Sequence, residues 1–152
     1  MQRNSMEDFQ RDICHRVLKQ EDGTILLTGT IRDRFHDIEV RVQVEPEALT
    51  ITQLQAEFRA APTQYCKRVN ERLQGLIGFP IGRGLQRKLV EVLGGGEGCG
   101  NLRTMLLGLL PLALNIRAAA GIRDEQEMLD AIHAQLAGTC AGYPDEADKT
   151  EK

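Results

Sequence analysis

The amino-acid sequence predicts an α+β fold: a four-stranded antiparallel meander sheet followed by three to four helices packed on it, including one long buried helix. Three observations predict this fold. Residues 36–45 alternate apolar and polar side chains, which is the period of a strand with one buried face. Asp22-Gly23 separates two apolar stretches and is typical of a tight hairpin turn, because glycine tolerates the positive φ that such a turn needs. After Pro62 the apolar spacing changes from two to about 3.6 residues, which favours helices.

The strands come first in the chain. We expect them at residues 13–19, 24–32, 36–45 and 49–59. The connections between them are short, which favours antiparallel neighbours. In the fourth strand the apolar phase shifts between Ile51 and Leu54, and such a shift predicts a β-bulge.

The helices follow. We expect them at residues 63–77, 84–93, 101–120 and 124–136. The segment 101–120 is apolar on nearly all sides, which is typical of a buried central helix. Pro111 lies inside it and predicts a bend, because proline lacks the backbone N–H. The densest apolar part, residues 105–114, is shorter than the roughly 20 residues of a membrane span, so a core helix is expected.

Length and composition predict one domain. The chain has 152 residues, is 41% apolar and carries a net charge of −3. We expect a flexible N-terminus at 1–10, a single α+β domain at 11–138 and a charged tail at 139–152. The dispersed basic residues argue against nucleic acid as a partner, and a protein partner or a homo-oligomer stays open. No apolar run follows the N-terminal charges, so we expect a cytoplasmic protein without a membrane segment, with free thiols at its four cysteines.

The most specific stretch is glycine-rich and contains a cysteine. Residues 94–100 hold five glycines, which favours a backbone that takes positive φ or approaches another group closely. Cys99 lies where the helix 101–120 is expected to begin, and the positive end of a helix dipole favours a reactive thiolate. Cys99 is therefore the candidate catalytic residue, and Gly98 and Gly100 are candidate cofactor-binding residues. The stretch matches neither the P-loop nor the dinucleotide-binding pattern, which argues against nucleotide binding.

A second cysteine extends this candidate site. Cys66 lies in the first turn of the expected helix 63–77, so two thiols begin helices that are expected to pack on the same sheet. His36 and Asp37 stand together at the start of the third strand. Imidazole, carboxylate and two thiolates make a four-ligand set that suits a metal ion. The alternative for each cysteine is simple packing, because free cysteine is among the most buried residue types.

Three short segments resemble a known family. They are His36-Asp37-Ile38, Ala60-Ala61-Pro62-x-x-x-Cys66 and Gly98-Cys99-x-Asn101-Leu102. Over most of residues 12–120 the chain resembles the bacterial family named domain of unknown function 2889. In that family Gly-Cys-x-His-Leu starts the long helix, and here Asn101 stands at the histidine position. The family name implies no activity.

The order of elements is also similar to that of the U-type iron–sulfur cluster scaffold proteins. This resemblance implies cluster ligands near His36, at Asp37 and at Cys99. Pro62 falls where a cysteine is wanted, and Cys66 comes about one turn later.

These observations leave three hypotheses. The first is a thiol-centred site of Cys66 and Cys99 with His36 and Asp37, which binds a metal ion or an iron–sulfur cluster or acts as a redox pair. The second is an enzyme with Cys99 as nucleophile, His36 as base and loop N–H groups as oxyanion donors. The third is a binding or assembly module in which the cysteines are core residues. The first hypothesis requires Cys66 and Cys99 to share a cleft, whereas the third places them in the core.

Overall fold

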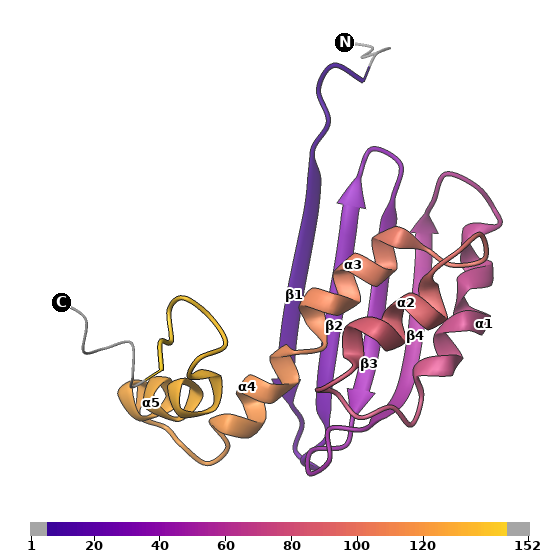
Figure 1. Ribbon diagram of the computed structural model, residues 1–152. Helices are drawn as coiled ribbons and strands as arrows, with labels where there is room; N and C mark the ends of the chain where they lie inside the picture. Colours follow the sequence, from indigo (N-terminus) through magenta and orange to yellow (C-terminus); the bar gives the residue numbers. More distant parts are fainter. Residues whose placement is uncertain (1–5, 146–152) are drawn as a thin grey trace. The chain divides into compact units, whose positions relative to one another are not determined.

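The computed structural model describes residues 6–145 and divides the chain into two compact units, with the boundary between Ala113 and Leu114 (Figure 1). The sequence predicted one domain over 11–138, and the pattern contained no signal for this boundary. Residues 1–5 of the expected flexible N-terminus and 146–152 of the expected tail lie outside the described residues. The two units are described one after the other.

The first unit is built on one antiparallel sheet. Its strands are β1 (Arg11–Lys19), β2 (Ile25–Asp33), β3 (Asp37–Val44) and β4 (Ile51–Ala60). The spatial order β1-β2-β3-β4 is the order in the chain, so the predicted four-stranded meander is confirmed. The first hairpin turns at Gly23, which takes a φ of 88°, as the Asp-Gly pair predicted.

β4 contains the predicted bulge. Val44 lies opposite Ile51, but its neighbour Gln43 lies opposite Gln53, so Thr52 is an extra residue on β4. A second register shift lies between Asp37 and Ile38. The bulge keeps the apolar side chains on one face after the phase shift, since a slip of one residue moves a side chain to the other face.

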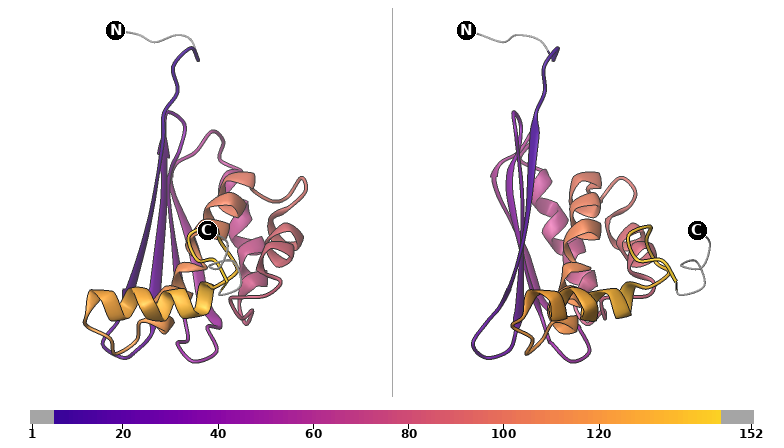
Figure 2. Two further views of the ribbon diagram at one scale, coloured as in Figure 1. Left: turned by 60° about the vertical axis from the view of Figure 1, so that its left-hand side comes forward. Right: turned by 90° about the vertical axis from the view of Figure 1, so that its left-hand side faces the viewer.

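One face of the sheet forms the core. Its apolar side chains are almost fully buried, among them Ile25, Leu27, Ile31, Ile38, Val40, Val42 and Val44. The helices of the first unit cover this face (Figure 2). The other face is polar, and the carboxylate of Glu39 forms ion pairs there with Arg41 at 2.7 Å and Arg59 at 3.2 Å.

The expected helix 63–77 is interrupted. It consists of the 3₁₀ turn η1 (Cys66–Arg68), the short α1 (Val69–Leu73) and the 3₁₀ turn η2 (Gln74–Leu76), so the prediction of one continuous α-helix was wrong. Apolar residues three and four apart fit both helix types, which is why the spacing did not separate them. The next helix, α2 (Leu85–Leu93), agrees with the expected 84–93.

The long apolar segment forms two helices, α3 (Gly100–Leu109) and α4 (Leu112–Ala118). The prediction of one bent helix was wrong in this respect: the chain stops being helical before Pro111, which has no N–H to continue the ladder. α3 packs closely on the sheet because a glycine lies on each side of the contact, Gly29 on β2 and Gly108 on α3. A Cβ on Gly29 would lie 2.8 Å from the sulfur of Met105, and a Cβ on Gly108 would lie 2.8 Å from the ring of His15.

The outer edge of β4 is paired with groups other than a strand. The side chain of Asn70 acts like a peptide group: its Oδ1 accepts from the N–H of Ala56 and its Nδ2 donates to the C=O of Ala56, both at 2.9 Å. The Nε2 of Gln74 donates to the C=O of Leu54 at 3.2 Å. Where β4 begins, the segment 78–81 takes over, with backbone hydrogen bonds to Ile51 and Leu49. This edge of the sheet is therefore capped.

The second unit contains α5 (Glu125–Leu136), as predicted for 124–136. Asp124 caps its N-terminus by accepting from the N–H of Glu127 at 2.9 Å. No residue of α5 is buried, and Leu129 is 47% exposed. The ring of His133, in the last turn of α5, lies 5.1 Å from that of Tyr143, which follows the helix.

Candidate functional site

Cys66 and Cys99 line the same pocket. The pocket has a volume of about 370 Å³ and lies between the start of η1 and α1 on one side and the glycine-rich loop on the other. Both cysteines are free thiols and partly exposed. Arg68 and Arg72 lie in the same wall as Cys66. The structure thus brings together two thiols that are 33 positions apart in the sequence. We call this the thiol pocket.

Cys99 is the residue that precedes α3. It has an extended backbone, its N–H donates to the C=O of Leu93 at 3.1 Å, and its C=O accepts from the N–H of Arg103 at 3.0 Å. Its sulfur makes no capping hydrogen bond, and Gly100 follows as the first helical residue. Cys66 correspondingly begins η1, where the hydroxyl of Thr63 lies 3.7 Å from its sulfur. Both thiols therefore stand at the start of a helical segment, as expected.

The glycines of the loop close the end of α2. The N–H of Gly94 donates to the C=O of Val90 at 2.8 Å, and Gly95 takes a φ of 73°. A Cβ on Gly98 would lie 1.8 Å from the carbonyl oxygen of Leu93, so only glycine fits there. Two loop N–H groups, those of Gly98 and Cys99, already donate to backbone carbonyls. Much of the glycine content is thus explained by the termination of α2.

Arg72 fixes the loop to α1. Its guanidinium donates to the C=O of Val92 at 3.0 Å and to that of Glu91 at 3.2 Å, which are free acceptors at the C-terminus of α2. A third nitrogen lies 4.0 Å from the carboxylate of Glu97 in the loop. Arg68 instead stacks over the ring of Tyr65 at 4.6 Å. The two walls of the thiol pocket are therefore connected by one side chain.

His36 belongs to a different cluster. Its Nδ1 lies 2.9 Å from the carboxylate of Asp33, and its Nε2 lies 3.4 Å from the side-chain nitrogen of Asn101. Arg11 contacts both partners, with 2.7 Å to Asp33 and 2.8 Å to the Oδ1 of Asn101. We call these four residues, from β1, β2, the turn before β3 and α3, the Asp33 cluster.

The carboxylate of Asp33 is the centre of this cluster. Its side chain is fully buried. Burial by itself raises the pKa of the Asp33 carboxyl, but the backbone N–H of Phe35, the ring of His36 and the guanidinium of Arg11 outweigh burial and lower the pKa to about 2. Arg11 and Asp33 are not among the site residues predicted from the sequence. No local pattern marks them, because they meet only through the register of the first hairpin, in which Arg11 lies directly opposite Asp33.

Asp37 lies apart from both groups. Its carboxylate contacts Arg32 at 3.4 Å and Arg59 at 3.6 Å. Among residues 6–145, no group of three or more His, Cys, Asp and Glu side chains is placed to hold a metal ion. The structure therefore brings Cys66 and Cys99 together and gives His36 and Asp37 other contacts, and a metal role for these two stays a prediction.

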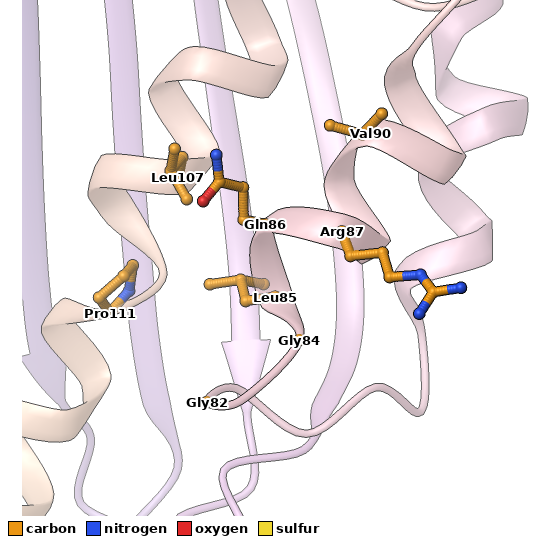
Figure 3. Close-up of a pocket in the computed structure, with 8 residues that line it drawn as sticks. All are labelled: Gly82, Gly84, Leu85, Gln86, Arg87, Val90, Leu107 and Pro111. Carbon is orange, nitrogen blue, oxygen red and sulfur yellow. The ribbon is translucent and has the colours of Figure 1, made fainter.

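A second concave surface lies between the start of α2 and the end of α3 (Figure 3). Leu85, Leu107 and Pro111 line it, and the guanidinium of Arg87 points away from Leu107 and Pro111. No cysteine, histidine or carboxylate lines it. This surface offers no group for nucleophilic or acid–base chemistry, so the thiol pocket is the better candidate.

Comparison with protein families assigns the chain to a family. The model of a family described as "Protein of unknown function (DUF2889)" matches residues 9–114. The chain belongs to the DUF2889 family. The match covers the sheet, the thiol pocket and the Asp33 cluster, and it ends where the first unit ends. No curated protein and no solved structure matches the chain.

The family match and the helices also bear on two expectations from the sequence, the resemblance to iron–sulfur scaffold proteins and the absence of a membrane segment. The similarity to U-type iron–sulfur scaffold proteins is not supported, because the family match is to DUF2889 alone and Pro62 leaves one ligand place without a thiol. None of the helices in the described part of this DUF2889 protein has the length and apolar character needed to cross a membrane.

Proposed function

We propose that the thiol pocket of this DUF2889 domain is a redox site in which Cys66 and Cys99 exchange disulfides with a small disulfide compound. The observation that carries the proposal is that both free thiols line one pocket. Two carboxylates, those of Glu71 and Glu97, also line the pocket, but no three His, Cys, Asp or Glu side chains among residues 6–145 are grouped so that they could hold a metal ion. This favours the redox pair over the metal ion among the predicted activities.

The exchange has two steps. The thiolate of one cysteine attacks a sulfur of the small disulfide, and one half of that compound leaves as a thiolate. The second cysteine then attacks the mixed disulfide and releases the other half. The domain ends with a Cys66–Cys99 disulfide, the small disulfide has become two thiols, and the two protons of the cysteines balance the two leaving thiolates.

The loop supports this chemistry mechanically. A disulfide needs Cα atoms within about 7 Å of each other, and an adaptable backbone beside one of the two cysteines favours reaching that distance. The glycines on the N-terminal side of Cys99 supply a backbone with few side-chain contacts, and a Cβ on Gly96 would meet nothing within 4 Å. While this backbone adapts, the contacts of Arg72 with Val92 and Glu97 hold the loop near α1.

Equilibration of the folded protein with oxidised and reduced glutathione tests the proposal. After acid quenching and alkylation, peptide mapping by mass spectrometry should show a Cys66–Cys99 disulfide that forms and disappears reversibly. Cys99→Ser should leave Cys66 as a mixed disulfide with glutathione, while Cys140→Ser, a change at an exposed thiol outside the pocket, should leave the Cys66–Cys99 pair unchanged. If neither pocket thiol reacts until the protein is denatured, the proposal is refuted and the cysteines are packing residues.

A further inference from the structure

The two edges of the sheet differ. β4 is capped by Asn70, Gln74 and the segment 78–81, whereas β1 pairs with β2 alone and has no neighbour on its other side within the sheet. β1 is nine residues long. Ile13 and Leu18 on it are 47% and 46% exposed. A long edge strand with exposed apolar side chains is a template for pairing with another strand.

The two faces of β1 carry different side chains. Ile13 and Val17 lie opposite buried residues of β2, Ile31 and Leu27, and so face the helix side of the sheet. The other face of β1 carries the alternate residues: Asp12, Cys14, Arg16 and Leu18. All four are exposed. Within the described part of the chain neither Asp12 nor Arg16 forms an ion pair, and the carboxylate of Asp12 accepts a hydrogen bond from the Nε2 of Gln10 at 3.0 Å.

We propose that β1 is a dimerisation edge that pairs antiparallel with β1 of a second copy of this chain, with Cys14 at the two-fold axis. An axis perpendicular to the sheet keeps the helices of both copies on one side, so residues directly opposite each other share a face. With Cys14 at the centre, Asp12 lies opposite Arg16 of the partner subunit, and Arg16 lies opposite Asp12 of the partner subunit. The two unpaired charges of each edge are thereby matched.

The helix side agrees with this register. Ile13 lies opposite His15 of the partner subunit and diagonal to Ile13 and Val17 of the partner subunit. Cross-strand neighbours in these positions touch, so the exposed half of Ile13 becomes covered by apolar side chains. The neighbouring register of the same symmetry, centred on His15, places Arg11 opposite Lys19 of the partner subunit at both ends and leaves Asp12 opposite a leucine. Like charges directly opposite each other destabilise a strand pair, so the register centred on Cys14 is favoured.

The register makes a specific chemical prediction. Residues directly opposite each other in an antiparallel pair have Cα atoms about 4.5 or 5.5 Å apart, and both distances lie within the range that a disulfide bridges. Mild oxidation of the wild-type protein with copper–phenanthroline should therefore give a covalent dimer whose peptide map contains a Cys14–Cys14 disulfide. Cys14→Ser should abolish this dimer, and Cys140→Ser, at the other exposed cysteine, should retain it.

Charge reversal tests the register without oxidation. In reduced protein followed by sedimentation velocity, Arg16→Asp puts like charges opposite each other twice and should weaken the dimer about tenfold. Asp12→Arg should do the same, and the double variant Asp12→Arg/Arg16→Asp should restore wild-type association. A protein that stays monomeric throughout the micromolar range, or a dimer that neither charge reversal weakens and in which Cys14 does not cross-link, overturns the proposal.

Discussion

Replacement of Asp33 by asparagine should destabilise the protein and make its free energy of unfolding less dependent on pH below about pH 4. The substitution removes the charge at the centre of the Asp33 cluster, which the guanidinium of Arg11 contacts at 2.7 Å and the ring of His36 at 2.9 Å. The variant keeps the size of the side chain, so the loss reports the charge and its hydrogen bonds rather than a cavity. Asn101 and Arg11 remain in contact with each other in the variant.

The magnitude follows from the pKa. The Asp33 carboxyl has a pKa of about 2 in the folded protein, against an ordinary value of 3.8 that applies to the unfolded chain. Because the folded-state pKa is the lower one, the ionised carboxylate stabilises the folded state above pH 3.8, and this contribution is lost as the pH falls toward 2. The difference corresponds to about 2 kcal/mol at neutral pH, of which about half is gone at pH 3.

Urea unfolding of both proteins at pH 7 and at pH 3 measures this contribution. Asp33→Asn should lower the free energy of unfolding at pH 7 by about 2 kcal/mol and by only about 1 kcal/mol at pH 3. Asp37→Asn is the matched control: its carboxylate is partly exposed and contacts Arg32 and Arg59 at 3.4 and 3.6 Å, so about 0.5 kcal/mol or less is expected. An equal loss for Asp33→Asn at both pH values would refute the reasoning, because the loss would then be independent of charge.

Two further substitutions test the loop and the capped edge by the same unfolding measurement. Gly98→Ala places a Cβ 1.8 Å from the carbonyl oxygen of Leu93 and should lower the free energy of unfolding by more than about 2 kcal/mol. Gly96→Ala is the control and should lower it little, because the space around Gly96 is open. Equal losses for the two variants would contradict the close approach of Gly98 to Leu93. Asn70→Ala removes both hydrogen bonds to the edge of β4 and should cost about 1 to 3 kcal/mol, against near zero for the exposed Gln53→Ala; a neutral Asn70→Ala would mean that water replaces the amide at that edge.

The sheet could be predicted because its information is local. Alternation in residues 36–45, the Asp22-Gly23 turn and the phase shift after Ile51 each act within a few residues, and all three have their structural counterpart. The helices were harder. The spacing in residues 63–77 fits α and 3₁₀ turns alike. Pro111 predicts a bend, but the chain stops being helical before it.

The candidate site could be predicted only in part, because its contacts are long-range. That Cys66 and Cys99 begin helical segments could be inferred from local signals, and the structure brings both to one pocket. His36 and Asp37 are adjacent in the sequence, but β3 begins at Asp37 and their side chains have different partners. His36 contacts Asp33, whereas Asp37 contacts arginines such as Arg59. The partners of His36 depend on the register of the first hairpin and on the placement of α3, neither of which a pattern along the chain contains.

Because the edge of β4 is capped, another chain can add a strand to this sheet only at β1. A sheet that is open at both edges can add chains indefinitely and grow into a fibre, which is the geometry of cross-β aggregates. Here the amides of Asn70 and Gln74 occupy one edge from within the chain. Strand pairing through β1 therefore ends at two copies, since each copy offers a single free edge and pairing consumes it. Loss of the two amides would uncover the middle of β4, while the segment 78–81 would still cover its start.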